Sequence, residues 1–304
     1  MVGLKVIFKA RSNPASSKEL RKVRLSVLSN YYPVSLALAL TWVFTYLLGA
    51  SDIHPERPVV TPIEEPKPST PPAEALASPA PYLNTLIFIS IIAVAGVVLI
   101  YLARRRPGLF KALITVMIWL VSLSITVLYL VTAAVVTQPL IAALWLPIGI
   151  GVATIVTFLL VRGGGLGAAS AAAFIASGSG GVIGISIPYW TFLILVAGIS
   201  VYDVVAVFRG HLSTLSREDA PQLRGLAVEV GDVMLGLGDL FFYSLTLSAI
   251  LWNLGAASAI AATIMLFIGY TLVLALLRKR RLLPGLPIPL LTALAAALTV
   301  AYIV

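Results

Sequence analysis

The chain is built from repeated stretches of about 20 mostly apolar residues, the length that an α-helix needs to cross the hydrocarbon core of a bilayer. Of its 304 residues, 60% are hydrophobic and 11% are charged, whereas roughly 25% are charged in a typical soluble domain. Backbone polar groups inside lipid must be satisfied within their own segment, so such stretches fold as helices. The sequence therefore predicts an all-α, multi-pass membrane protein and excludes a soluble globular fold.

Charged segments and Pro/Gly-rich breaks divide the apolar sequence into nine predicted transmembrane helices. Six of them precede a basic segment, at 32–50, 82–103, 112–136, 139–161, 166–187 and 190–208. Three follow it, at 233–251, 256–277 and 287–304. The weakest boundary is the glycine-rich stretch 163–167, between the fourth and fifth helices. The domain organisation that follows is a basic tail (1–31), a first membrane region (32–208) with a Pro-rich external loop (51–81), a cytoplasmic loop (209–232) and a second membrane region (233–304).

The distribution of Lys and Arg predicts the orientation. With a cytoplasmic N-terminus, only Arg57 and Lys67 of the 21 basic residues fall in external segments. Cytoplasmic loops of membrane proteins carry an excess of Lys and Arg. We therefore expect a cell-membrane protein with its N-terminus in the cytoplasm and its C-terminus outside. The net charge of +9 is explained in this way without a nucleic-acid partner.

Two acidic residues, Asp203 and Asp239, lie inside predicted helices that contain no basic residue. A carboxylate at the centre of a membrane helix costs about 2.5–3.5 kcal/mol on insertion scales, so such residues usually mark a functional site. Asp203 precedes Arg209 by about 9 Å of helix, and Asp239 lies near the start of the next helix. The two acids therefore fall at similar depth on antiparallel neighbours. Facing carboxylates that share a proton can hydrolyse a peptide bond, whereas the same pair could serve an ion or proton pathway.

The sequence around the second aspartate and before the last helix also points to a site. Glycines at 236 and 238 flank Leu237 and precede Asp239, which allows another backbone to approach closely. Prolines at 284, 287 and 289 prevent a regular helix at the start of the last apolar stretch. Irregular backbone at membrane depth is tolerated where it is buried in protein or lines a wet cavity. We expect this segment to line a cavity on the side of the two aspartates.

Three motifs occur in order: Tyr202-Asp203, then Gly-Leu-Gly-Asp at 236–239, then Pro-Gly-Leu-Pro at 284–287. Together they resemble the YD, GxGD and PALP motifs of the presenilin and signal peptide peptidase family of intramembrane aspartic proteases, with Gly285 where the family usually has Ala. Signal peptide peptidases run in the opposite orientation. The predicted cytoplasmic N-terminus and the Phe-Tyr-Ser sequence at 242–244 favour the presenilin-like branch, as a prokaryotic or archaeal homologue.

The resemblance implies a presenilin-like fold and an endopeptidase that cuts transmembrane segments of membrane proteins or remnant signal peptides. It implies that Asp203 and Asp239 form the catalytic dyad and that other motif residues bind the substrate, namely Tyr202, Gly236, Leu237, Gly238, Pro284, Gly285, Leu286 and Pro287. A strand within Val228–Leu235 could pair with an unwound substrate by β-augmentation. No cofactor, metal or obligate partner subunit is expected.

Two other functions compete with this interpretation. A proton- or cation-coupled transporter or leak channel could use the same aspartates, although no inverted repeat typical of transporters is evident. A prepilin-type peptidase also uses a GxGD motif, but the Tyr202-Asp203 pair and the proline motif argue against it. The sequence has no cysteine and only two histidines, neither in a predicted helix, which excludes cysteine, serine–histidine and zinc mechanisms in the membrane.

Overall fold

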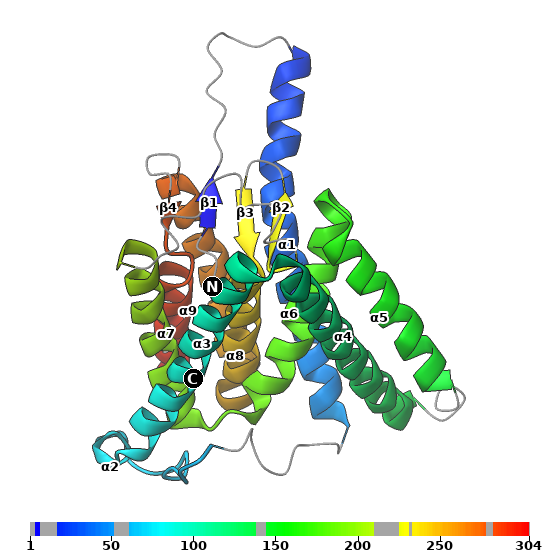
Figure 1. Ribbon diagram of the computed structural model, residues 1–304. Helices are drawn as coiled ribbons and strands as arrows, with labels where there is room; N and C mark the ends of the chain where they lie inside the picture. The colour runs from blue at the N-terminus through cyan, green and yellow to red at the C-terminus, as the bar shows by residue number, and fades with distance from the viewer. Residues whose placement is uncertain are drawn as a thin grey trace.

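Most of the described chain is helical. The computed structural model describes residues 4–6, 17–51, 61–137, 144–209, 225–230, 233–277 and 282–303. Within these ranges the helices are α1 (Ser17–Ala50), α2 (Pro72–Ala77), α3 (Ala80–Arg105), α4 (Pro107–Thr137), α5 (Trp145–Val161), α6 (Gly165–Ser186), α7 (Tyr189–Arg209), α8 (Leu237–Leu277) and α9 (Pro287–Ile303). The long helices form a bundle, with a small sheet at one end (Figure 1).

Six of the described helices are long and apolar enough to cross a membrane, and α5 and α9 are shorter apolar helices. The prediction of a multi-pass helical membrane protein is confirmed. Each predicted span overlaps one of these helices, and the weak boundary at 163–167 is the real junction between α5 and α6. The number of nine crossings and the direction of insertion stay predictions.

Helix α8 contains two of the predicted spans. Its 41 residues are interrupted at Gly255, which has φ 82° and ψ 177°, a left-handed conformation that glycine adopts readily. The rings of Tyr243 and Tyr270 lie 6.4 Å apart, whereas a continuous helix would separate these positions by about 40 Å. The chain therefore reverses near Gly255, and α8 is a hairpin of two antiparallel segments.

The predicted start of the first of these two spans, at Val233, is wrong. Residues Val233–Gly236 form strand β3, and the helix begins at Leu237. Strand β2 (Ala227–Val230) pairs antiparallel with β3, with Val230 opposite Val233. Where one strand was expected, within Val228–Leu235, the structure has two antiparallel strands. Strand β2 lies inside the segment expected to be a loop at 209–232, and β3 directly follows that segment.

The same sheet includes strands that are distant in sequence. Its order is β2-β3-β1-β4, with β1 at Leu4–Val6 and β4 at Leu282–Leu283. Strand β1 is antiparallel to both neighbours: Lys5 lies opposite Met234 of β3 and Leu282 of β4. The expectation of an all-α fold is therefore incorrect at this end of the bundle, where the fold is mixed.

Residues 61–81, the described part of the Pro-rich segment expected to be an external loop at 51–81, pack against the bundle. They contain the short helix α2, and Glu65 caps the start of α7. The Glu65 carboxylate accepts hydrogen bonds from the backbone N–H groups of Trp190, at 3.0 Å, and Thr191, at 2.8 Å. The side chain of Asn84 on α3 also bonds the backbone of Ile63. These contacts fix the loop to α3 and to α7, the helix that carries Asp203.

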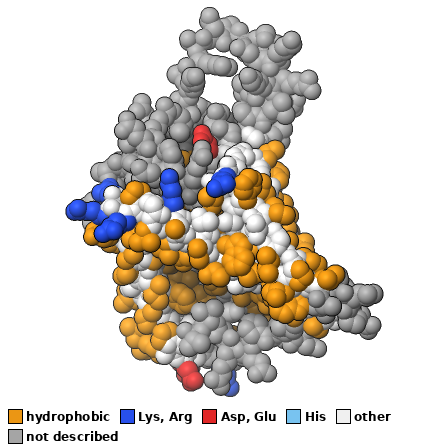
Figure 2. All heavy atoms as spheres, turned by 45° about the vertical axis from the view of Figure 1, so that its right-hand side comes forward, with side chains coloured by type: hydrophobic (Ala, Val, Ile, Leu, Met, Phe, Trp, Pro, Cys, Tyr) orange, Lys and Arg blue, Asp and Glu red, His pale blue; other side chains and the backbone are white. Residues whose placement is uncertain are grey.

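The surface of the described residues agrees with a membrane environment. Large apolar side chains are exposed on the outer helices, among them Val94 and Val97 of α3 and Val116 of α4. Figure 2 shows a broad band of apolar side chains on one face, with Lys and Arg gathered along its upper margin. Arg104–Arg106, Lys111 and Arg162 lie at helix ends on the same side of the bundle as the sheet (Figure 1). The cytoplasmic position of that side stays a prediction.

Candidate active site

Both membrane aspartates are buried at the end of the bundle that carries the sheet. Asp203 lies near the end of α7 and is 1% exposed, and Asp239 lies in the first turn of α8 and is 2% exposed. The local sequence predicted an aspartate close to one end of each helix. Helix α7 ends at Arg209, six residues after Asp203, and α8 begins just after the first glycine of the Gly-Leu-Gly-Asp motif. Their position on two different helices that meet at this end of the bundle agrees with the sequence-based expectation, and their depth in the membrane stays a prediction.

A short irregular segment between β4 and α9 brings the two carboxyl groups together. The backbone N–H of Leu286 donates a hydrogen bond of 3.0 Å to Oδ2 of Asp203. The preceding residue, Gly285, lies against the other aspartate, because a Cβ built there would be 3.2 Å from Cγ, Oδ1 and Oδ2 of Asp239. Consecutive residues of one turn therefore contact both carboxyl groups, and the turn 284–286 is central to the site.

The hydrogen bond to Asp203 comes from a helix N-terminus. The carbonyl of Leu286 accepts a bond from the N–H of Leu290 at 3.0 Å, which makes Leu286 the residue that opens α9. The first N–H groups of a helix have no partner within the helix and are well suited to bind a carboxylate. The Asp203 side chain thus satisfies a donor that the prolines of this segment leave free.

Asp239 is held differently. Its Oδ2 atom is buried, and among the described residues it has no hydrogen-bond partner. Buried polar atoms are nearly always hydrogen-bonded, so an unpaired carboxyl oxygen is an unusual feature that points to a functional role.

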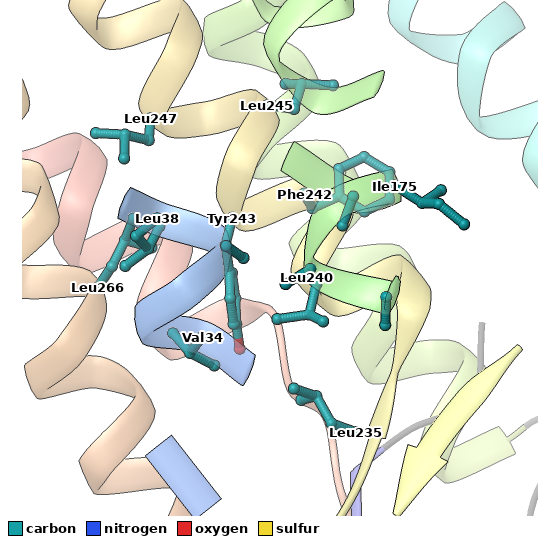
Figure 3. Packing of buried hydrophobic residues seen from close by; sticks show 14 of the residues in the cluster. Val34, Leu38, Ile175, Leu235, Leu240, Phe242, Tyr243, Leu245, Leu247 and Leu266 are labelled. Carbon is teal, nitrogen blue, oxygen red and sulfur yellow. The ribbon is translucent and has the colours of Figure 1, made fainter. Parts of the chain in front are cut away.

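Tyr243 was not among the site residues predicted from the sequence. Its hydroxyl donates a hydrogen bond of 2.7 Å to the carbonyl of Gly285, and its side chain is fully buried. Figure 3 shows the hydroxyl oxygen directed at the chain segment that leads into α9. Tyr243 follows Asp239 by four residues, a spacing that places both side chains on one helix face. That spacing is the signal by which the sequence could have indicated it.

The remaining predicted residues surround the dyad, and one of them, Gly236, donates a backbone hydrogen bond to the Asp239 carboxyl group. Gly236 ends β3, and Leu237 begins α8 while its N–H bonds the carbonyl of Leu226 at 2.9 Å. Tyr202 is half-buried, and its ring packs against the core. The other three, Gly238, Pro284 and Pro287, lie in the first turn of α8, in the irregular segment and at the start of α9. Their role in substrate binding stays a prediction.

No site for a metal ion is found in the part of the chain that the structure describes, since no group of three or more His, Cys, Asp or Glu side chains is close enough to hold one. The site consists of two buried carboxyl groups, a non-helical turn whose backbone bonds Asp203 and Tyr243, and the buried hydroxyl of that tyrosine. Paired carboxyl groups of this kind are the machinery of aspartic proteases, which need only water as a co-reactant.

The fold and the site together define a multi-pass helical membrane protein with a buried pair of aspartates on neighbouring helices. The family model described as "Signal-peptide peptidase, presenilin aspartyl protease" matches residues 59–223, more than half of the chain. The chain belongs to this family. The matched region contains Asp203 and ends before Asp239.

Solved structures share the fold. One, described as a presenilin family intramembrane aspartate protease in a C222 crystal form, aligns with a TM-score of 0.61 and 23% identity over 90% of this chain and 97% of that chain. A second, of a presenilin family protease in a P2 form, aligns with a TM-score of 0.60 and 20% identity over 90% of this chain and 96% of that chain. Comparison with curated protein sequences gives no significant match.

Proposed function

We propose that this protein is an intramembrane aspartic endopeptidase in which Asp203 and Asp239 activate one water molecule. The observation that carries the proposal is the contact of both carboxyl groups with consecutive residues of one turn, Gly285 and Leu286. Membership of an aspartyl protease family supports the same chemistry. The family does not favour the alternative of a proton- or cation-coupled transporter or channel.

The chemistry requires the pair to hold one proton between its two carboxyl groups. The ionised carboxylate takes a proton from water as the water attacks the scissile carbonyl carbon, and the protonated carboxyl group donates its proton to the carbonyl oxygen. The bond from Leu286 to Asp203 orients one carboxyl group. The unpaired Oδ2 of Asp239 supports contact of the other with the water or the substrate.

The substrate is proposed to be a transmembrane segment of a membrane protein, or a remnant signal peptide, bound as an extended strand. A helical peptide bond is shielded by its own hydrogen bonds, so the segment must unwind before hydrolysis. Strand β3 leads directly into the Asp239 motif, and β4 leads into the turn that contacts both aspartates. An extended peptide between these two strands would be held by backbone hydrogen bonds.

The position of β1 supports this mode of binding. Strand β1 lies between β3 and β4 and is antiparallel to both, and Leu4 lies opposite Leu283, the residue before the turn. An extended segment in this position has one end directed at the dyad. We propose that Gly236, Leu237 and Gly238 on one side, and Pro284–Pro287 on the other, contact the unwound substrate, with Tyr202 beside them.

The membrane topology proposed for this function has nine crossings, a cytoplasmic N-terminus and an external C-terminus in the cell membrane. The division of α8 at Gly255 and the basic residues at the sheet end of the bundle support it. In this topology the dyad lies in the cytoplasmic half of the bilayer. We propose that the protein acts without an obligate partner subunit.

The test is cleavage of a single-span reporter by the purified protein in detergent. The Asp203→Asn and Asp239→Asn variants keep the side-chain shape and remove the titrating group, so we expect each to lower kcat by at least about 100-fold. Glu229→Gln, which changes an exposed acid on β2, is the matched control and should retain full activity. Cleavage that survives either aspartate change refutes the two-aspartate mechanism, and cation flux in liposomes then tests the transporter alternative.

A further inference from the structure

We propose that Tyr243 is a positioning residue of this site, whose hydroxyl fixes the peptide unit that presents an N–H to Asp203. The inference rests on the proposed function and deepens it. Tyr243 touches neither aspartate through a hydrogen bond in the structure; it acts through the backbone of the turn 284–286.

The geometry of a single peptide bond carries the argument. The carbonyl of Gly285 accepts the hydrogen bond from Tyr243 at 2.7 Å, and the N–H of Leu286 donates the bond to Asp203 at 3.0 Å. These two groups belong to the same peptide unit, which is planar and trans. Its C=O and N–H therefore point in opposite directions as one rigid body. Rotation that breaks one hydrogen bond misdirects the other.

The Tyr243 hydroxyl, the Gly285–Leu286 peptide unit and the Asp203 carboxyl group thus form a hydrogen-bonded series that connects the two aspartate-bearing helices. Tyr243 is on α8, four residues after Asp239, and Asp203 is on α7. The peptide unit between them polarises further when both of its ends are hydrogen-bonded, which strengthens the bond to the carboxyl group. Because Gly285 also lies against Asp239, fixing this unit sets the position of both carboxyl groups.

The chain offers a matched control for the loss of a buried tyrosine hydroxyl. Tyr270 is also fully buried, on the second segment of α8, and its hydroxyl donates to the backbone carbonyl of Asn30 at 2.9 Å. Its ring lies 6.4 Å from that of Tyr243. The Tyr243→Phe and Tyr270→Phe variants therefore remove the same group, with the same type of acceptor, from neighbouring places in the core.

The experiment compares these two variants with the wild type by reporter cleavage and by thermal unfolding in detergent. We expect similar falls in melting temperature for both. Tyr243→Phe should lower kcat by about tenfold while KM stays within about twofold, because release of the peptide unit lets the reacting groups shift by about half an ångström, which slows chemistry more than binding. Tyr270→Phe should leave kcat within about twofold of the wild type.

Replacement of the hydroxyl by another donor provides a rescue test. Tyr243→p-aminophenylalanine retains an N–H donor at the same place and should restore most of kcat. If Tyr243→Phe fails to fold, Tyr243→p-methylphenylalanine replaces that variant in the comparison. Its methyl group fills the space of the hydroxyl but cannot donate a hydrogen bond.

Two outcomes overturn the inference: wild-type kcat in the variant that lacks the donor at 243, or an equal loss of kcat in Tyr270→Phe. The aspartate variants separate this failure from failure of the proposed function. If Asp203→Asn and Asp239→Asn are inactive and Tyr243→Phe is fully active, the dyad stands and only the role of Tyr243 falls. If either aspartate variant still cuts, the proposed function itself fails.

Discussion

The contact between α6 and α8 provides a sharp test of how the helix that carries Asp239 is positioned. A Cβ built at Gly184 of α6 would lie 2.5 Å from the carbonyl oxygen of Leu245, 2.8 Å from Cβ of Ser248 and 3.0 Å from the backbone N of Ala249. Two of these three atoms belong to the backbone of α8. A change of side-chain rotamer cannot relieve the clash, so Gly184→Ala must move the helices apart.

The size of the effect follows from these distances. Ordinary van der Waals contact begins near 3.4 Å, so a methyl group at 2.5 Å requires the helices to separate by roughly 0.9 Å. Overpacking of this kind costs about 1–3 kcal/mol of folding free energy. The displaced part of α8 begins at Leu245, less than two turns from Asp239, and a shift of 1 Å in a catalytic group can reduce the rate by about 100-fold. Gly184→Ala should therefore lower both stability and kcat.

A second glycine-to-alanine change serves as the control. Gly151 on α5 has no atom within 4 Å of the position where a Cβ would be added. Gly151→Ala should therefore raise stability by about 0.5–1 kcal/mol, because alanine restricts the unfolded chain more than glycine does. Thermal unfolding and reporter cleavage of the two variants form the assay. If Gly184→Ala is as stable and as active as Gly151→Ala, the close packing of α6 on α8 is refuted.

Three further predictions concern the turn, the sheet and the outer loop. Gly285→Ala should keep the fold and keep kcat within about threefold, because a Cβ 3.2 Å from the Asp239 carboxyl requires a shift of only a few tenths of an ångström; an inactive variant would contradict this. Proline cannot donate a hydrogen bond to a strand ladder. Val233→Pro should therefore break β3 and lower kcat/KM, whereas Lys5→Pro should release β1 from the position proposed for the substrate and raise kcat/KM. Unchanged cleavage of the reporter by both variants would count against strand binding. Glu65→Gln should lower the free energy of unfolding by about 1 kcal/mol with KM unchanged, because the negative charge stabilises the start of α7; an unchanged melting temperature would argue against this cap.

The helices were largely predictable because their signal is local. A run of apolar residues between charged segments identifies a membrane helix without knowledge of its neighbours. Proline at 287 marks the start of α9, as expected for a residue without an N–H group at the first position of a helix. The glycine at 255 ends one segment of α8 where the sequence predicted a break.

The sheet was harder to predict because short apolar runs do not reveal their conformation. Val233-Met234-Leu235 is equally compatible with a strand and with the first turn of a buried helix, since periodicity cannot separate them. Strand β1 is only three residues long, and its partners at 233–236 and 282–283 lie more than 200 residues away in the chain. Nothing in the sequence near Leu4 indicates those partners.

The site shows why the two aspartates stand out in the sequence and Tyr243 does not. Two acids in apolar helices are conspicuous, whereas one aromatic residue in an apolar helix resembles any core residue. The role of Tyr243 depends on a carbonyl 42 positions away in the sequence, at Gly285. That carbonyl is available only because the chain there is not helical.

The irregular turn explains how apolar sequence can position two acids. In a regular helix the carbonyl of Gly285 and the N–H of Leu286 would be consumed by the helix itself. Proline at 284 and 287 prevents that helix from extending, so the carbonyl bonds Tyr243 and the N–H bonds Asp203. Gly285 has no side chain, so the Asp239 carboxyl can lie against the same backbone. Both acids are therefore positioned by the backbone of the turn, with no basic side chain required in the surrounding helices.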